Sequence, residues 1–536
     1  MKSKYYLLTL GMAFVLVTVS ACGGAAATEA PPLREEAYSP PPSATEEPAY
    51  TYSQPRSASE DNAESMSPSM VPSSKKGEGE PDDMFFQDYG VNPSVHTGDD
   101  HLSTFGLDVD TGSYTIMRNY INDGYLPPSD SVRVEEYINY FEQGYESPSA
   151  HQAFSILIDG APSPFDESER YSMLRVGLQG YNVPDSERKD VSLTFVIDVS
   201  GSMDMDNRLG LVKRSLELLV ERLGSRDQVS IVVYGTDARV ILEPTSAQRK
   251  GRILDAIYRL RPEGVTNMEA GLRLGYKMAL RGINPRGINR VVLCSDGVAN
   301  VGKTEANQIL REVRGYVEEG VMLTTIGFGM DNYNDTLMEQ LADSGNGFYA
   351  YVDDIDEAER LFVDDLTSTL QTIALDAKVQ VDFNPDVVSS YRLVGYENRD
   401  VADEDFRNNK VDAGEIGAGH TVTALYAIKL YSHARGRIAT VYLRWEDPDT
   451  REVVEMSKDF ESYQMEKDFR NTDPHFQWTV IVAEYAEILR DSYWAEDSSL
   501  EDVYRQAQWT SEYLYLDEDV REFVDLVREA RRLADW

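Results

Sequence analysis

The stretch Asp198-Val199-Ser200-Gly201-Ser202 follows an apolar run at residues 191–196 and precedes an amphipathic segment. A short apolar run bounded by polar residues predicts a buried strand. In the segment after it, hydrophobic residues recur at intervals of three and four and therefore share one helix face: Leu209, Val212, Leu216, Leu219, Val220 and Leu223. A strand, a polar loop and a helix in this order predict the start of an α/β domain.

The alternation of strands and helices continues along the chain. Further strands are predicted at residues 229–234, 290–294, 322–327 and 347–351, and helices at residues 247–260, 268–281, 305–318, 336–344 and 356–370. This order predicts a doubly wound, Rossmann-like parallel sheet at residues 188–373. Ligands bind such sheets at the carboxyl ends of the strands, where the strand order reverses, so the loops at that edge form the candidate site.

Three of these loops carry oxygen-bearing side chains. Asp198, Ser200 and Ser202 follow the first strand, Thr266 precedes a helix, and Asp296 follows a later strand. Hard cations such as Mg²⁺ prefer oxygen ligands. Standing alone, the Asp-x-Ser-x-Ser motif is more often a helix cap. Its occurrence together with Thr266 and Asp296 favours a divalent metal site.

The five residues resemble the metal-ion-dependent adhesion site, or MIDAS, of von Willebrand factor type A (vWA) domains. The resemblance implies that Ser200 and Ser202 bind the metal directly. Thr266 would bind it directly or through water, and Asp198 and Asp296 largely through water. The resemblance also implies Mg²⁺, with Mn²⁺ or Ca²⁺ as alternatives, and a protein partner whose Asp or Glu carboxylate completes the metal shell. No catalytic residue is implied, so we expect a binding protein and not an enzyme.

The segments on both sides of the predicted vWA domain resemble the flanking domains of bacterial vWA lipoproteins. The resemblance rests on residues 103–114 (STFGLDVDTGSY), 394–399 (VGYENR) and 412–426 (DAGEIGAGHTVTALY). It implies an α+β domain at residues 84–187 and, at residues 374–536, a β-rich domain that ends in helices. Because the ends of an inserted domain lie close together, the strands before Asp190 and after Leu370 are predicted to pair in one discontinuous β-rich domain.

The N-terminus predicts export. Lys2 and Lys4 precede an almost wholly apolar run at residues 5–19, and Ser20 and Ala21 stand directly before Cys22, which is the layout of a secretory signal. Residues 19–22 resemble the lipobox of bacterial lipoproteins, which implies lipidation of Cys22. Two or more acyl chains give stable attachment, so we expect an extracytoplasmic protein anchored to the cell membrane, or to the outer membrane of a host that has one. Residues 23–83, rich in Ala, Pro, Ser, Glu and Thr, are predicted to be a disordered tether.

The charge of the chain excludes one class of partner, and its cysteines indicate that no disulfide forms. The 536 residues include 51 basic and 92 acidic ones, a formal net charge of -41. Nucleic acid is therefore excluded as a partner, because its phosphates need a positive surface. The two cysteines, Cys22 and Cys294, stand in such different contexts that no disulfide is expected. Cys294 ends an apolar run and is predicted to be a small buried residue.

Acidic residues near two of the motifs are expected to cap helices and not to take part in catalysis or metal binding. Asp108 and Asp110 match a phosphatase pattern only in part, and we expect them to cap a helix that begins near Tyr114. Asp204 and its neighbours Asp206 and Asn207 are expected to cap the helix toward Leu209.

Two alternatives to a metal-bridged binding protein stay open. One is a metal-dependent hydrolase or phosphatase, in which the cation activates water and a general base or a nucleophile is also required. The other is a structural scaffold for envelope assembly, in which the metal chiefly stabilises the loops. Metal-dependent stability without metal-dependent capture of a partner would favour the scaffold.

Overall fold

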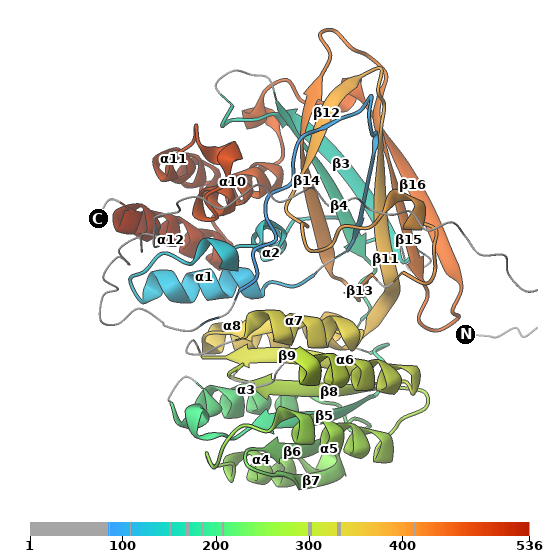
Figure 1. Ribbon diagram of the computed structural model, residues 1–536, viewed down its shortest axis with the longest axis vertical. Coiled ribbons are helices and arrows are strands. Elements are labelled where there is room, and N and C mark those ends of the chain that lie inside the picture. Colours follow the sequence, from blue (N-terminus) through green and yellow to red (C-terminus); the bar gives the residue numbers. More distant parts are fainter. Residues whose placement is uncertain are drawn as a thin grey trace, which may run out of the picture. The chain divides into compact units, whose positions relative to one another are not determined.

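A computed structural model describes residues 84–534 except for residues 85, 108, 150–151, 167–170, 185, 206–207, 298–302, 330–333 and 412. The predictions for the signal peptide, Cys22, the tether, Asp108, Asp206 and Asn207 lie outside the described residues. The described chain forms an α/β domain and a β-sandwich with helices on one side (Figure 1). No helix among the described residues is long and apolar enough to cross a membrane.

The α/β domain is built on a six-stranded sheet with the order β10-β9-β8-β5-β6-β7. Its strands are β5 (Val191–Asp198), β6 (Gln228–Tyr234), β7 (Ala238–Ser246), β8 (Ile288–Ser295), β9 (Met322–Phe328) and β10 (Tyr349–Val352). From β5 the chain winds through β6 toward one edge and through β8 toward the other, so the strand order reverses between β5 and β8. The doubly wound sheet is confirmed. The antiparallel edge strand β7 was not predicted.

Helices cover both faces of this sheet. They are α3 (Leu209–Arg222), α4 (Lys250–Tyr258), α5 (Met268–Arg281), α6 (Lys303–Glu318) and α7 (Asp335–Ser344). Along β5, Phe195 and Ile197 join the core on the α3 side, whereas Val196 joins the core on the α5 side. Cys294 on β8 is fully buried, as predicted. The expected single helix at residues 356–370 is wrong: the chain forms α8 (Ile355–Glu359), a π-helical turn η4 (Arg360–Asp364) and α9 (Leu366–Leu370).

The segments before and after the α/β domain share one sandwich. One sheet has the order β1-β12-β14-β4-β3, and the other has the order β13-β11-β15-β16, with β2 also paired to β11. The strands are β1 (Val95–His96), β2 (Leu102–Gly106), β3 (Phe154–Pro162), β4 (Ser172–Gly180), β11 (Thr372–Phe383), β12 (Val388–Val394), β13 (Gly414–Gly417), β14 (Thr421–Leu430), β15 (Arg437–Glu446) and β16 (Val453–Glu461). Because β4 pairs with β14, β2 with β11 and β1 with β12, the predicted pairing of the two flanks is confirmed.

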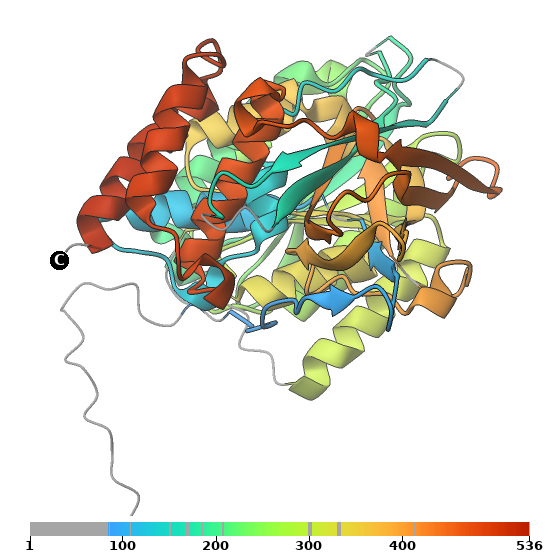
Figure 2. The ribbon, with the colours of Figure 1, turned by 90° about the horizontal axis from the view of Figure 1, so that it is seen from above.

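A helical layer packs on the outer face of the first of these sheets. It contains α1 (Gly112–Asn122), α2 (Val134–Asn139), α10 (Pro474–Leu489), α11 (Leu500–Ser511) and α12 (Glu518–Ala534). Buried aromatic residues such as Tyr137, Trp478 and Phe523 join these helices to Met173 and Leu425 of the sheet. Figure 2 shows the C-terminal helices, in red, lying together along one side.

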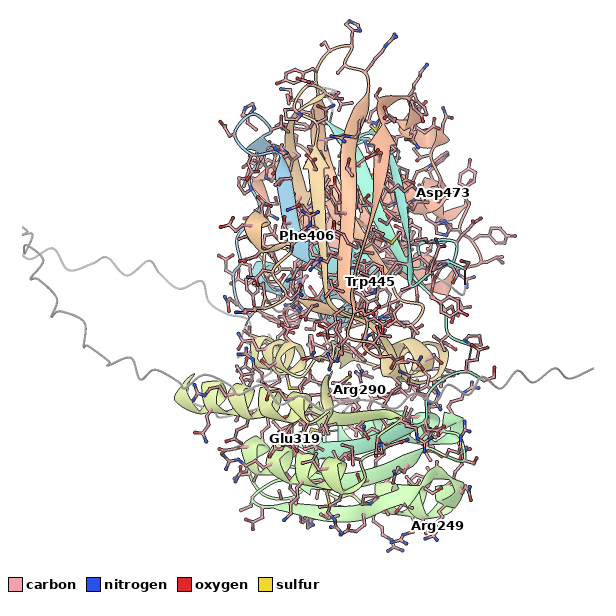
Figure 3. All side chains as sticks on the ribbon, turned by 90° about the vertical axis from the view of Figure 1, so that its right-hand side faces the viewer. Arg249, Arg290, Glu319, Phe406, Trp445 and Asp473 are labelled. Carbon is pink, nitrogen blue, oxygen red and sulfur yellow. The ribbon has the colours of Figure 1, made fainter. Side chains whose placement is uncertain are left out.

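Buried ion pairs join the α/β domain to the sandwich and its helices. Arg133, just before α2, pairs with Asp335 at the start of α7, with 2.6 Å between Nη1 and Oδ2. Arg118 of α1 pairs with Asp353, which follows β10, at 2.6 Å. Arg290 of β8 also lies at this junction (Figure 3). Removing one member of such a pair leaves a buried charge uncompensated, so these contacts hold the inserted domain in one orientation.

The capping role predicted for the carboxylates near Tyr114 is wrong for Asp110. Helix α1 begins after Thr111, whose side chain makes no capping hydrogen bond, and the Ser113 amide donates instead to Oε2 of Glu136 at 2.7 Å. Asp110 accepts a hydrogen bond from the Tyr349 amide of β10 at 2.9 Å. Asp110 thus contacts the inserted domain, and it also contacts Arg399 of the sandwich at 3.4 Å. Both partners lie far from it in the sequence, where a local capping rule does not look.

Candidate metal centre

The Asp-x-Ser-x-Ser loop folds tightly around its first carboxylate. Asp198 is the last residue of β5 and is fully buried. Its Oδ1 accepts from the Ser200 amide at 2.8 Å, and its Oδ2 accepts from the Ser295 hydroxyl at 3.1 Å. The hydroxyl oxygens of Ser200 and Ser202 lie 3.0 Å apart. The loop thus gathers two hydroxyls and one carboxylate in one place.

The loop that carries Thr266 lies directly against this first loop. The Gly201 amide donates to the Gly264 carbonyl at 3.1 Å, and the Glu263 amide donates to the Val199 carbonyl at 2.5 Å. Gly264 has a φ of +77°, in the left-handed region that glycine adopts readily. These contacts place partly exposed Thr266 in the loop next to Ser200 and Ser202.

Asp296 reaches the same edge from β8. Strands β5 and β8 are parallel neighbours, with Ile197 opposite Cys294, so the residues that follow them emerge side by side. Asp296 is fully buried. The structure therefore brings Asp198, Ser200, Ser202 and Asp296 together at the reversal of strand order.

Arg208 belongs to this centre and was missed by the sequence reasoning. Its Nη1 donates to Oδ2 of Asp296 at 2.9 Å and to the carbonyl oxygen of Ser202 at 2.9 Å. Gly329 makes room for it, because a Cβ at that position would lie 2.5 Å from Nε of Arg208. A basic residue at the start of a helix carries no local signal of a carboxylate partner that lies 88 positions later.

The site carries more buried negative charge than its arginine offsets. Burial and the neighbouring Asp296 raise the pKa of Asp198 to about 6, although hydrogen bonds from Ser200 and Ser295 lower it. A second buried carboxylate nearby disfavours the charged form of Asp198. A cation bound beside them would relieve this cost.

The residues fit a hard divalent cation. Every side chain of the predicted set offers oxygen, and hydroxyls outnumber carboxylates, so the donor set suits an ion that keeps part of its water. Within the described residues there is no group of three or more His, Cys, Asp and Glu side chains arranged to hold a metal.

The helix cap predicted at Asp204, shortly after Ser202, is wrong. The chain forms only a short 3₁₀ helix there, η2 (Gly201–Asp204), and α3 begins at Leu209. Asp204 is exposed, and Arg208 occupies the N-cap position of α3 without a side-chain capping bond. The positive charge near Asp296 is thus supplied by a guanidinium and not by a helix dipole.

Comparison with known proteins agrees with this architecture. The family model "von Willebrand factor type A domain" matches residues 192–364, "von Willebrand factor" matches residues 80–173, and "Uncharacterized protein YfbK, C-terminal" matches residues 368–533. The chain is 35% identical over 451 residues to the uncharacterized protein YfbK of Escherichia coli (strain K12), covering 79% of this chain and 77% of YfbK. The chain belongs to the YfbK family of bacterial vWA proteins.

Other similarities cover mainly parts of the chain. The uncharacterized protein sll0103 of Synechocystis is 31% identical over 205 residues, which are 38% of this chain and 46% of that protein. Among solved structures, a von Willebrand factor type A protein from Catenulispora acidiphila aligns with a TM-score of 0.43 and 14% identity, covering 70% of this chain and 89% of that one. In this YfbK-family chain, the segments matched before and after the vWA domain build one sandwich together.

Proposed function

We propose that this YfbK-family chain is a membrane-anchored protein outside the cytoplasm that binds a protein partner through a divalent metal, most favourably Mg²⁺. The convergence of Asp198, Ser200, Ser202 and Asp296 at one edge of the vWA sheet carries the proposal. Proteins with vWA domains commonly mediate protein–protein interaction, and the family membership supports the same class of function here.

Each residue of the centre has a separate task in this proposal. Ser200 and Ser202 bind the cation through their hydroxyls, Thr266 binds directly or through water, and Asp198 and Asp296 hold water molecules of the shell. Arg208 holds Asp296 in place. A bound cation with so few charged ligands would be an electrophilic site for a carboxylate oxygen of the partner. No bond is broken in this scheme, so we propose no catalytic role.

Capture of a partner from envelope extracts tests this proposal. The purified full chain is immobilised and exposed to extract with Mg²⁺ or with EDTA, beside the Asp198→Ala and Asp204→Ala variants. Asp204 is exposed on the same loop and serves as the matched control. We expect one protein to be retained only with metal, by the unchanged chain and by Asp204→Ala. Equal retention with Mg²⁺ and with EDTA, and equal retention by the unchanged chain and by Asp198→Ala, would contradict the proposal.

The proposed anchor is tested separately. Cys22→Ser removes the acceptor of the lipid, so we expect the protein to move from the membrane fraction to the soluble fraction. An unchanged membrane fraction would show that Cys22 does not anchor the chain. This outcome would leave the metal-dependent binding untouched.

A further inference from the structure

A second concave site lies in the sandwich, on the face of the first sheet that packs against α10. It is a cavity of about 630 Å³. Its floor is one cross-strand row, in which Arg392 of β12 stands opposite Ala427 of β14, and Ala427 stands opposite Met173 of β4. The small Ala427 side chain between two large neighbours leaves the hollow. The depth of the cavity is therefore set by the register of the sheet.

Aromatic rings form much of the wall. The indole Nε1 of Trp494 donates to the carbonyl oxygen of Asn92 at 3.2 Å, which fixes the ring. The guanidinium of Arg392 lies 4.9 Å from the centroid of that ring. Tyr171 meets Trp494 edge-on with centroids 6.4 Å apart, and Tyr493 lies 4.8 Å from it. Arg392 covers one face of Trp494, and the remaining ring faces and edges offer contacts of fixed position.

Among the described residues that line the cavity, three carboxylates accompany one arginine. Glu484, Asp497 and Asp166 line it. Arg392 also lines it, but this arginine is paired with Glu487, with 3.3 Å between Nη1 and Oε1. Burial raises the pKa of Glu484 to about 7, even though Ser498 donates a hydrogen bond to it. The charge of Arg392 offsets this shift only in part, and a positively charged ligand would add to that offset.

We propose that this cavity binds an organic cation, an ammonium or guanidinium group on an aliphatic stem, as carried by a polyamine or by a lysine or arginine side chain of a peptide. Aromatic faces attract such cations, and carboxylates pair with them. The cavity lies within the usual size range of small-ligand sites, about 300–1,000 Å³. The site belongs to the sandwich and does not depend on the proposed metal centre.

Isothermal titration calorimetry on the full chain tests the inference with three probes. These are spermidine, N-acetyl-lysine methylamide and its neutral isostere N-acetyl-norleucine methylamide. We expect saturable binding of at least one cationic probe, and binding of the isostere that is weaker by about tenfold or more. The tighter of the two cations identifies the source, a free polyamine or a peptide side chain. Equal binding of the isostere, or no binding of either cation, would overturn the proposal.

Three variants locate the binding. Glu484→Gln removes the charge and keeps the shape of the side chain. We expect this variant to bind the cationic probe about tenfold more weakly. Ala427→Leu fills the hollow without touching a carboxylate, and we expect it to abolish binding. Glu512→Gln, an exposed residue at the end of α11, is the control and should bind as the unchanged chain does. Circular dichroism establishes that each variant is folded. Unchanged binding in both folded Glu484→Gln and folded Ala427→Leu would contradict the site.

Discussion

Two buried carboxylates of the vWA domain have pKa values shifted in opposite directions. Burial raises the pKa of Glu357 on α8, but attraction to Arg360 and Arg118 outweighs burial and holds the pKa below its usual range. Burial raises the pKa of Asp198 to about 6, and the neighbouring Asp296 adds to the shift. Glu357 has its counter-charge within the fold. Asp198 receives hydrogen bonds from Ser200 and Ser295, which carry no charge.

Burial also raises the pKa of Asp353 at the junction to about 6, although Arg118 contacts it, so the junction and the candidate metal centre differ in their ion pairs and not in the direction of every pKa shift. At the junction, guanidinium groups meet carboxylates directly, and Arg118 contacts both Asp353 and Glu357. At the metal centre, Arg208 contacts Asp296, and two buried carboxylates share the site. A site that is short of positive charge gains stability from an external cation, whereas a compensated cluster does not.

Removing the counter-charge at the junction should have the largest effect. Arg118→Met leaves Asp353 and Glu357 buried without this guanidinium, so we expect a loss of about 3–5 kcal/mol in the free energy of unfolding. Urea denaturation at pH 7 measures it. Arg521→Met is the control, because Arg521 forms an exposed pair with Glu518 that should contribute less than about 1 kcal/mol. A small effect of Arg118→Met would show that the two clusters do not differ as proposed.

The junction also contains a histidine whose charging opposes folding. Burial, and then the charges of Arg360 and Arg290, lower the pKa of His420 to about 4. Within the described part of the chain, its Nδ1 has no hydrogen-bond partner. Since the unfolded chain binds this proton near pH 6.5, the contribution of neutral His420 is present above that pH and is lost as the pH falls toward 4.

The expected size of this loss is up to about 3 kcal/mol, because one pKa unit corresponds to about 1.4 kcal/mol. His420→Gln should make the decline in stability between pH 6.5 and pH 4 shallower by that amount. Urea denaturation at several pH values measures the difference. Parallel pH profiles of the two chains would assign the acid sensitivity to other groups.

The parts of the molecule that were predicted correctly depend on local pattern and on one topological rule. The periodicity of residues 268–281 predicts α5 at its observed bounds. The rule that ligand sites form where strand order reverses predicts Asp198 and Asp296 at one edge of the sheet, and the parallel pairing of β5 with β8 brings both residues to that edge. Strand β7 was not predicted for two reasons. It contains Pro244, which disfavours a strand, and the alternation of strands and helices does not require an antiparallel edge strand.

The remaining features depend on contacts between distant residues. Arg208 could not be assigned to the metal centre, because its partner Asp296 lies on another loop. The cavity in the sandwich was not predicted either. Ala427 forms its floor only because β12 and β4 lie on either side of β14, and no sequence pattern indicates that register.

At the metal centre, removal of the buried carboxylate should weaken cation binding. If Asp198 holds water of the metal shell, Asp198→Ala should weaken Mg²⁺ binding by about 10–100-fold, the usual range for groups that act behind the direct ligands. Calorimetric titration of the full chain with MgCl₂ measures the change. Asp204→Ala on the same loop should bind as the unchanged chain does. An equal loss in both variants would indicate a general effect of local negative charge.

A backbone change gives the smallest effect and tests whether the loop of Thr266 belongs to the centre. Gly264 has a φ of +77°, and a Cβ there would lie 2.2 Å from the Thr236 hydroxyl oxygen. Gly264→Ala should therefore cost about 1–2 kcal/mol of stability and displace the loop that carries Thr266.

Displacement of the Thr266 loop in Gly264→Ala should weaken Mg²⁺ binding by several-fold. A loss of about 1–2 kcal/mol in stability would not weaken binding in a chain that stays folded. Gly251→Ala is the matched control, because Gly251 lies in helix α4 and nothing stands within 4 Å of its added Cβ. That substitution should stabilise the helix by about 0.5–1 kcal/mol and leave Mg²⁺ binding unchanged. If Gly264→Ala is destabilised but binds Mg²⁺ as the unchanged chain does, Thr266 is not a ligand and the centre is confined to the loops after β5 and β8.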